Sequence, residues 1–188
     1  MIISKLLKDK MHNRGVPGWF IHEIFDRNYH INDGELLSWT LIPLLDQMPI
    51  LSSHKDRYGV KAAEQARVLT DAAMQISLQC FQITPGFKKL SDEFKNYLNE
   101  SSTWHLQSFF SGIRLKYNHT KLKSVIEASF WSSHDYGVKI NDWGFNPMNQ
   151  AAHAAHVFTQ SATILDSEFV WSEAAKLLQK ISKNNEDS

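Results

Sequence analysis

Cysteine is almost missing from this sequence, which has a single one, Cys80, in 188 residues. A lone cysteine cannot form an internal disulfide, and it cannot supply the several thiolates of a cysteine-based zinc site. Cys80 lies in an apolar, helical pattern with no histidine or cation beside it to activate the thiol. The sequence therefore predicts a core position for Cys80 in a protein of the reducing cytoplasm.

An excess of charge of either sign is also missing, because 20 Lys and Arg balance 20 Asp and Glu. No overall field favours nucleic acid or an anionic membrane, so neither is expected as a partner. Glycine is scarce, with eight residues, and forms neither a Gly-x-Gly-x-x-Gly pattern nor a P-loop. These absences exclude the common nucleotide-binding loops, and we expect no cofactor.

Long apolar runs are absent as well. The uncharged stretch 72–87 is interrupted by glutamine, serine, threonine, proline and glycine, and no window reaches the ~20 apolar residues of a membrane span. Near the N-terminus, Lys5 and Lys8 break up the apolar residues too early for a signal-peptide core. We therefore expect a soluble cytoplasmic protein.

Helical periodicity is the main positive signal. It predicts a long helix over 58–81 that ends at a Thr-Pro-Gly turn, and further helices over 104–116, 120–131 and 147–165. Ser91 and Ser167 are predicted to open two more helices, the last one fraying after Lys183. Prolines predict short, kinked helices before residue 52. The fold class is therefore all-α, a single compact multi-helix domain over 1–183 with a frayed tail over 184–188, and only 136–145 is allowed a short hairpin.

Two histidines, His153 and His156, lie three residues apart in the run Ala-Ala-His-Ala-Ala-His, where both could bind one metal ion. Zinc-protease helices instead place two histidines four residues apart, with an adjacent glutamate as the base. Alanines fill the gap in this chain, so that mechanism lacks its base. Because alanine lets another helix approach closely, we expect the imidazoles to pack at a helix interface rather than bind a metal.

A second motif has His134 next to Asp135 in the run Ser-His-Asp-Tyr-Gly, at the end of a predicted helix. It resembles the central motif of the helical HD phosphohydrolases. That resemblance implies a metal site completed by His105 or His119 and by Asp166, with a metal-bound water that attacks phosphate. The alternative is a helix exit in which Asp135 forms a local turn.

Aromatic side chains, which include six Trp and eleven Phe, exceed what one small core hides. Some are expected at the surface, where tryptophan and tyrosine supply much of the energy of protein interfaces. The predicted loop 136–149 combines Tyr136, Asp142, Trp143 and Asn146 with two glycines. We predict that these four residues contact a partner protein, and the alternative for Trp143 is a connector residue that fills the core.

The alanine- and histidine-rich helix at 151–156 is similar to helices of the all-helical bacterial immunity proteins, which protect bacteria from polymorphic or contact-delivered toxins. The resemblance implies a protein that binds a cognate toxin and occludes its active site without turnover. Immunity proteins against nucleases are often acidic, and this neutral chain departs from that composition, so a nuclease is disfavoured as the toxin. The alternatives are a metal-dependent phosphohydrolase built on His134 and Asp135, and a helical regulatory or scaffold subunit.

Overall fold

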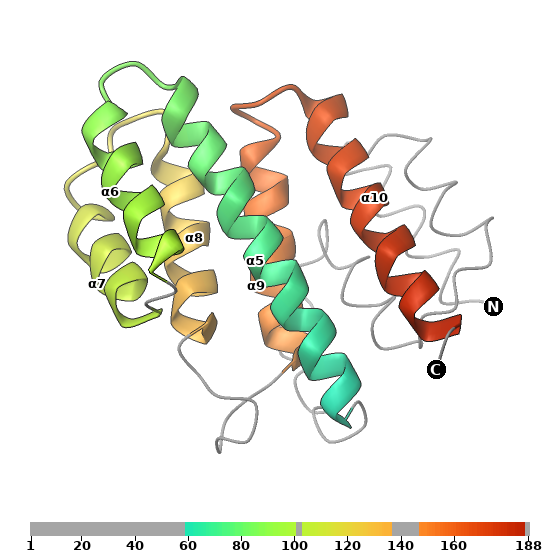
Figure 1. The fold of residues 1–188 in the computed structure, drawn as a ribbon. Helices are drawn as coiled ribbons and strands as arrows, with labels where there is room; N and C mark the ends of the chain where they lie inside the picture. Colours follow the sequence, from blue (N-terminus) through green and yellow to red (C-terminus); the bar gives the residue numbers. More distant parts are fainter. Residues whose placement is uncertain (1–58, 101–102, 137–146, 187–188) are drawn as a thin grey trace.

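Six helices make up the described part of the chain, and the predicted all-α fold is confirmed there (Figure 1). The computed structural model describes residues 59–100, 103–136 and 147–186. Its helices are α5 (Gly59–Ile83), α6 (Lys88–Asn99), α7 (Thr103–Ile113), α8 (Lys123–Tyr136), α9 (Pro147–Ser161) and α10 (Ser167–Glu186). Within these ranges there is no strand, and no helix is long and apolar enough to cross a membrane. Apart from Tyr136, the allowed hairpin lies outside them, as do the predicted kinked helices.

The central helix of this arrangement is α5, which contacts α6, α8, α9 and α10. Its most extensive contact is with α9, and α8 packs against both, so these three helices form the middle of the bundle. On one side of them lie α6 and α7, and on the other lies α10 (Figure 1). The two outer helices α6 and α7 pack on each other, and only α7 reaches α8 extensively.

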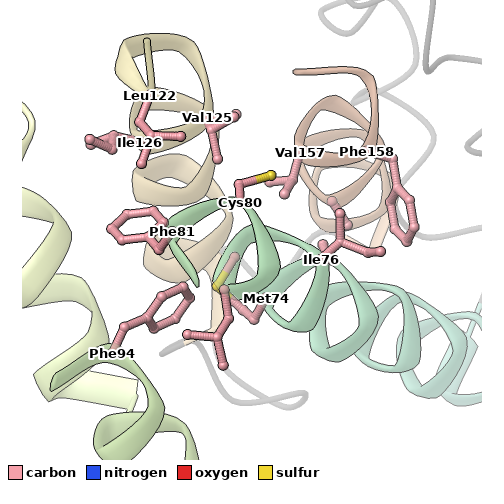
Figure 2. Packing of buried hydrophobic residues seen from close by; sticks show 14 of the residues in the cluster. Met74, Ile76, Cys80, Phe81, Phe94, Leu122, Val125, Ile126, Val157 and Phe158 are labelled. Atoms are coloured by element: carbon pink, nitrogen blue, oxygen red, sulfur yellow. The ribbon is translucent and has the colours of Figure 1, made fainter. Parts of the chain in front are cut away.

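The core between α5, α6 and α7 is built from phenylalanine rings. Phe81 of α5 is fully buried, and its ring centroid lies 5.4 Å from Phe94, 5.9 Å from Phe87 and 6.2 Å from Phe110. Most of these rings meet edge to face, the geometry that the aromatic quadrupole favours. Figure 2 shows Phe81 beside Phe94 of α6, so this cluster joins the outer helices to the centre of the bundle.

Cys80 occupies the core position that the sequence predicts. Its side chain is fully buried and lies near Val157 of α9 (Figure 2). Burial disfavours the thiolate and raises the pKa of Cys80 to about 11.

The turn after α5 forms where the Thr-Pro-Gly signal predicts it. The Thr84 hydroxyl donates a hydrogen bond of 2.7 Å to the Cys80 carbonyl, and Gly86 has a φ of +85°. Only glycine adopts this left-handed conformation without strain. The start of α6 differs from the prediction, because the helix begins at Lys88 and Ser91 lies inside it, buried. The reason is that Phe87 enters the core directly after the turn, which commits the chain to helix before Ser91.

Several later helix boundaries differ from the predicted ones: α7 ends at Ile113 rather than at 116, and α8 begins at Lys123 rather than at 120. Helix α8 continues past Trp131 because Ser132 and Ser133 are buried in the bundle rather than exposed at a helix end. The predicted helix over 147–165 ends at Ser161, and backbone hydrogen bonds close the turn that follows. Helix α10 begins at Ser167 as predicted, but its side-chain cap is Asp166, whose carboxylate accepts the Phe169 N–H at 3.0 Å. This helix continues past Lys183 to its last described residue.

Candidate functional site

The four residues predicted to contact a partner lie at or beyond an edge of the described chain. Tyr136 is the last residue of α8, and its side chain is outside the described part. Asp142, Trp143 and Asn146 fall in the segment 137–146, which is also outside it. Their contact with a partner therefore stays a prediction, and the site below is built from other residues.

The His-Asp pair lies in the last turn of α8, where the His134 side chain is exposed and that of Asp135 is outside the described set. The Nδ1 atom of His134 lies 2.6 Å from Nε2 of Gln107 on α7. An amide nitrogen can only donate, so Nδ1 accepts this hydrogen bond and the neutral ring carries its proton on Nε2. The exposed edge of His134 therefore presents a donor to the solvent.

The other residues that the phosphohydrolase resemblance implies have local roles. His105 on α7 pairs with Glu100, with 3.7 Å between Nδ1 and Oε2, and Asp166 caps α10. His119 is exposed in the turn between α7 and α8. Among the residues that the structure describes, no three histidine, cysteine, aspartate or glutamate side chains lie close enough to hold one metal ion. A metal site at His134 would therefore need Asp135 or residues outside the described ranges.

The histidine pair of α9 lies next to α8. The His153 ring is 6.2 Å from the ring of Trp131, with 34° between the two planes. One turn later, Nδ1 of His156 is buried and has no hydrogen-bond partner within the described structure. Burial and the nearby His153 hold the pKa of His156 below its ordinary value. His153 thus belongs to the surface around Trp131, and His156 to the interior beneath it.

We expect the buried His156 to make the fold sensitive to acid. A depressed pKa means that the unfolded chain binds the proton first, so the contribution of His156 to the free energy of unfolding is constant above about pH 6.5 and falls below it. One proton gives a slope of at most about 1.4 kcal/mol per pH unit. Urea denaturation between about pH 8 and pH 5 should show this slope for the native chain and a flatter profile for His156→Gln. The exposed His105→Gln is the control, and an equal slope in His156→Gln would contradict the assignment.

Arg114, at the end of α7, organises the surface of α8. Its guanidinium carbon lies 3.9 Å from the centre of the Phe130 ring and 5.8 Å from that of Trp131. The same guanidinium donates to both carboxylate oxygens of Glu127, at 3.2 Å from Nε and 2.5 Å from Nη2. Two parallel hydrogen bonds fix the plane of the guanidinium, and stacking on an aromatic ring adds a cation–π contact. Arg114 is therefore held flat against α8, although it is only partly buried.

Three exposed apolar side chains lie on α7, on α8 and in the turn between them. Trp131 of α8 is 45% exposed, Trp104 near the start of α7 is 72% exposed, and Leu115, just after α7, is 77% exposed. Trp104 lies one turn before Gln107, which contacts His134, and Leu115 follows Arg114. The surface across α7, α8 and α9 is called the aromatic face here, and it consists of Trp104, Gln107, Arg114, Leu115, Phe130, Trp131, His134 and His153.

The sequence predicts the exposed aromatics of this face but not its organisation. A surplus of tryptophan and phenylalanine indicates that some rings stay outside the core, and Trp104 and Trp131 do. Nothing in the sequence indicates the role of Arg114. Its partners Glu127 and Phe130 lie in another helix, and the contacts with them depend on how α7 packs against α8. In the sequence His153 is a possible metal ligand, and the structure places its ring beside that of Trp131.

No protein-family model, curated protein or solved structure matches the chain. The residues of the aromatic face and their chemistry are therefore the basis for assigning a function.

Proposed function

We propose that this chain is a protein-binding protein, an immunity protein that neutralises a cognate toxin by covering its active site with the aromatic face. The observation that carries the proposal is the half-exposed Trp131 beside an arginine already fixed by Glu127 and Phe130. Tryptophan and arginine are the residues most enriched among those that dominate binding energy at protein interfaces. An inhibitor needs only such a surface, because it performs no turnover.

The rigidity of Arg114 supports this reading. Binding restricts flexible side chains, at about 0.5–1.5 kcal/mol for each one that is immobilised. Arg114 is already restricted by its two hydrogen bonds to Glu127 and by the ring beneath it, so a partner can bury it with little further ordering. His134, also on α8, is similarly held by its hydrogen bond with Gln107. The Nε2–H group of His134 therefore points in a fixed direction and can donate to a partner.

The aromatic face also has the layout of a protein interface. Its apolar side chains, Trp104, Leu115 and Trp131, are separated by polar groups that can hydrogen-bond to a partner. Interfaces combine buried aromatic anchors with hydrogen-bonding groups at their edges, and they tolerate charge where it is paired. Arg114 is paired with Glu127, so covering it does not strand an isolated charge.

The test begins with capture of a partner from the source cells on the purified full-length chain, followed by identification of the captured protein. That protein is then expressed in a susceptible host with and without the chain. We expect growth arrest by the partner alone and relief by the native chain. In a binding assay, Trp131→Ala should raise the Kd by roughly 30-fold or more, the value of a side chain worth about 2 kcal/mol, and should abolish relief of growth.

Phe169→Ala is the matched control, because Phe169 is also an exposed aromatic residue but lies on α10, which is remote from α7. The Kd of the Phe169→Ala variant for the partner should stay within about twofold of the native value. If Phe169→Ala and Trp131→Ala weaken binding equally, the aromatic face is not the binding surface. A captured partner that causes no growth arrest would contradict the immunity function and favour a scaffold or regulatory subunit.

Elemental analysis of the purified chain separates the proposal from the phosphohydrolase alternative. Stoichiometric zinc, iron or manganese that is lost in His134→Ala, together with phosphatase activity, would identify an enzyme and count against the inhibitor. A metal-free chain that blocks its partner's activity would support the inhibitor.

A further inference from the structure

Five exposed lysines gather at the end of the bundle next to the aromatic face. They come from the start of α6, from the turn after α7 and from the start of α8, and the Phe87 and Tyr117 rings, 5.3 Å apart, join these segments. In Figure 1 the start of α6, the end of α7 and the start of α8 all lie at one end of the bundle. This group is called the lysine end, and it consists of Lys88, Lys89, Lys116, Lys121 and Lys123.

Few acids are available to compensate the lysine end. Asp92, Glu93 and Glu127 follow Lys88, Lys89 and Lys123 by four residues, but Glu93 is bonded to Tyr97 and Glu127 to Arg114. The sequence has no aspartate or glutamate from residue 72 to 91, or from 101 to 126. Within the described structure none of the five lysines forms an ion pair, and Lys116 lies over the Tyr117 ring with 5.5 Å between Nζ and the ring centre. The balanced net charge of the chain therefore conceals a strongly positive region.

These charges oppose the stability of the helices that carry them. The N-terminus of a helix bears a partial positive charge and favours acidic side chains, yet the first turns of α6 and α8 contain lysine and no acid. Lys88 and Lys89 open α6, and Lys123 opens α8. Helix N-termini prefer acidic side chains, and here two neighbouring helices carry lysine instead, with no ion pair to offset it. Such repeated departures in one place are typical of a functional site.

A groove of about 400 Å³ between α6 and α7 opens beside Lys116 of the lysine end. Its apolar walls are formed by Leu90, Phe109 and Ile113, and Tyr117 lies at the lysine end together with Lys116. One carboxylate, Glu93, also lines the groove, and its Oε1 accepts a 3.0 Å hydrogen bond from the Tyr97 hydroxyl. The groove is wide enough for an apolar side chain, and Lys116 lies at its border.

Gly112 lines this groove. It lies in α7, where glycine destabilises a helix relative to alanine, and it has no conformational need to be glycine because its φ is not positive. A Cβ atom built at Gly112 would meet no atom within 4 Å, so packing does not require glycine either. Alanine at position 112 would stabilise α7 more than glycine does. The groove is therefore a second place where the residue is not the one that favours helix stability.

We propose that the lysine end and the α6–α7 groove together bind an acidic segment of the partner protein, with an apolar side chain of that segment in the groove over Gly112. The inference deepens the proposed function and rests on it in taking the ligand to be part of the partner. Charge complementarity defines the segment as acidic. Because none of the five lysines forms an ion pair in the described structure, the carboxylates of the segment are their natural counter-ions. The exposed Leu115, next to Lys116, connects this site to the aromatic face.

The probe is a fluorescein-labelled peptide of glutamates with one central leucine, and binding to the full-length chain is measured by fluorescence anisotropy at low ionic strength. We expect binding that weakens with added salt and a Kd at least about tenfold higher for Gly112→Leu, which fills the groove. Gly112→Ala leaves most of the groove open and should bind within about twofold of the native chain. A glutamate peptide without the leucine should bind more weakly.

The lysines are tested by Lys121→Glu with Lys123→Glu, compared with Lys95→Glu with Lys176→Glu, which changes the net charge equally but lies elsewhere on α6 and α10. The first pair should raise the Kd at least about tenfold and the second pair by less than about twofold. The first pair puts acids at the N-terminus of α8, so its Tm should be equal or higher by about 2 °C, which separates lost binding from lost folding.

Trp131→Ala should bind the peptide as tightly as the native chain does. Loss of partner binding in Trp131→Ala therefore tests the proposed function, and loss of peptide binding in the lysine and Gly112 variants tests this inference. No binding of the peptide by the native chain, or equal losses in both lysine pairs, would overturn the inference. Tighter binding to phosphatidylserine vesicles or to a DNA duplex than to the peptide would also overturn it, in favour of a membrane or a nucleic acid.

Discussion

Replacing Phe81 by alanine will lower the free energy of unfolding by about 3–5 kcal/mol. The ring is fully buried and meets Phe87, Phe94 and Phe110 at centroid distances of 5.9, 5.4 and 6.2 Å. Truncation removes the transfer free energy of the ring and leaves a cavity that the neighbouring rings, held in different helices, fill only in part. Urea denaturation followed by circular dichroism measures the loss as a lower midpoint with little change in slope.

Ile83→Ala is the control for this experiment, because Ile83 lies on the same helix but is 57% exposed. Its effect on the free energy of unfolding should stay within about 0.5 kcal/mol, as for most surface substitutions. Since domains of this size are stable by about 5–15 kcal/mol, Phe81→Ala removes a large share of the total. A loss below about 1 kcal/mol would mean that the aromatic cluster does not join α6 and α7 to α5.

The thiol of Cys80 will react with a disulfide reagent at least about a hundredfold more slowly in the folded chain than in the unfolded chain at neutral pH. The reactive species is the thiolate, and raising the pKa from 9.0 to about 11 reduces the thiolate fraction by about that factor. Complete burial slows the reaction further, because the reagent reaches the sulfur only when the bundle opens. The measurement compares the labelling rate in buffer with the rate in guanidinium chloride, and similar rates in both would contradict the buried position.

The same raised pKa predicts a loss of stability in base. The unfolded chain releases the Cys80 proton first, so this contribution is fully present below about pH 9 and is lost as the pH rises toward 11. Cys80→Ala should remove this part of the alkaline decline.

Local signals in the sequence predict where α5 ends, because the chemistry of the turn is local. Thr84 bonds to a carbonyl four residues earlier, and Gly86 supplies the left-handed conformation that the exit requires. The apolar spacing along α5 predicts its buried side, which includes Met74 and Leu78. For such elements the residues within one or two turns determine the conformation.

Other features depend on contacts between helices, and the sequence alone does not predict them. The Ser77 and Ser129 hydroxyl oxygens are 2.7 Å apart in the core although the two residues are 52 positions apart in the chain. Buried serines such as Ser132 also explain why α8 extends beyond its predicted end, since in the sequence they resemble a polar helix exit. Arg114 is a similar case, because its role depends on the packing of α7 against α8.

The clustering of Lys88 and Lys89 with Lys123 also depends on how the helices pack. In the sequence, Lys88 and Lys123 belong to separate helices and to a chain with no net charge. Only the arrangement that brings the starts of α6 and α8 to one end of the bundle makes them neighbours. Charge summed over a chain therefore says little about the local fields that a partner meets.

The packing of α5 on α9 has a consequence for synthesis on the ribosome. The last residue of α5, Ile83, is translated well before Pro147, where α9 begins. At about 5–20 residues per second, this separation corresponds to several seconds at least. During that interval the α9-facing side of α5 has no native helix against which to pack, so the nascent chain presents an apolar surface to chaperones until α9 is made.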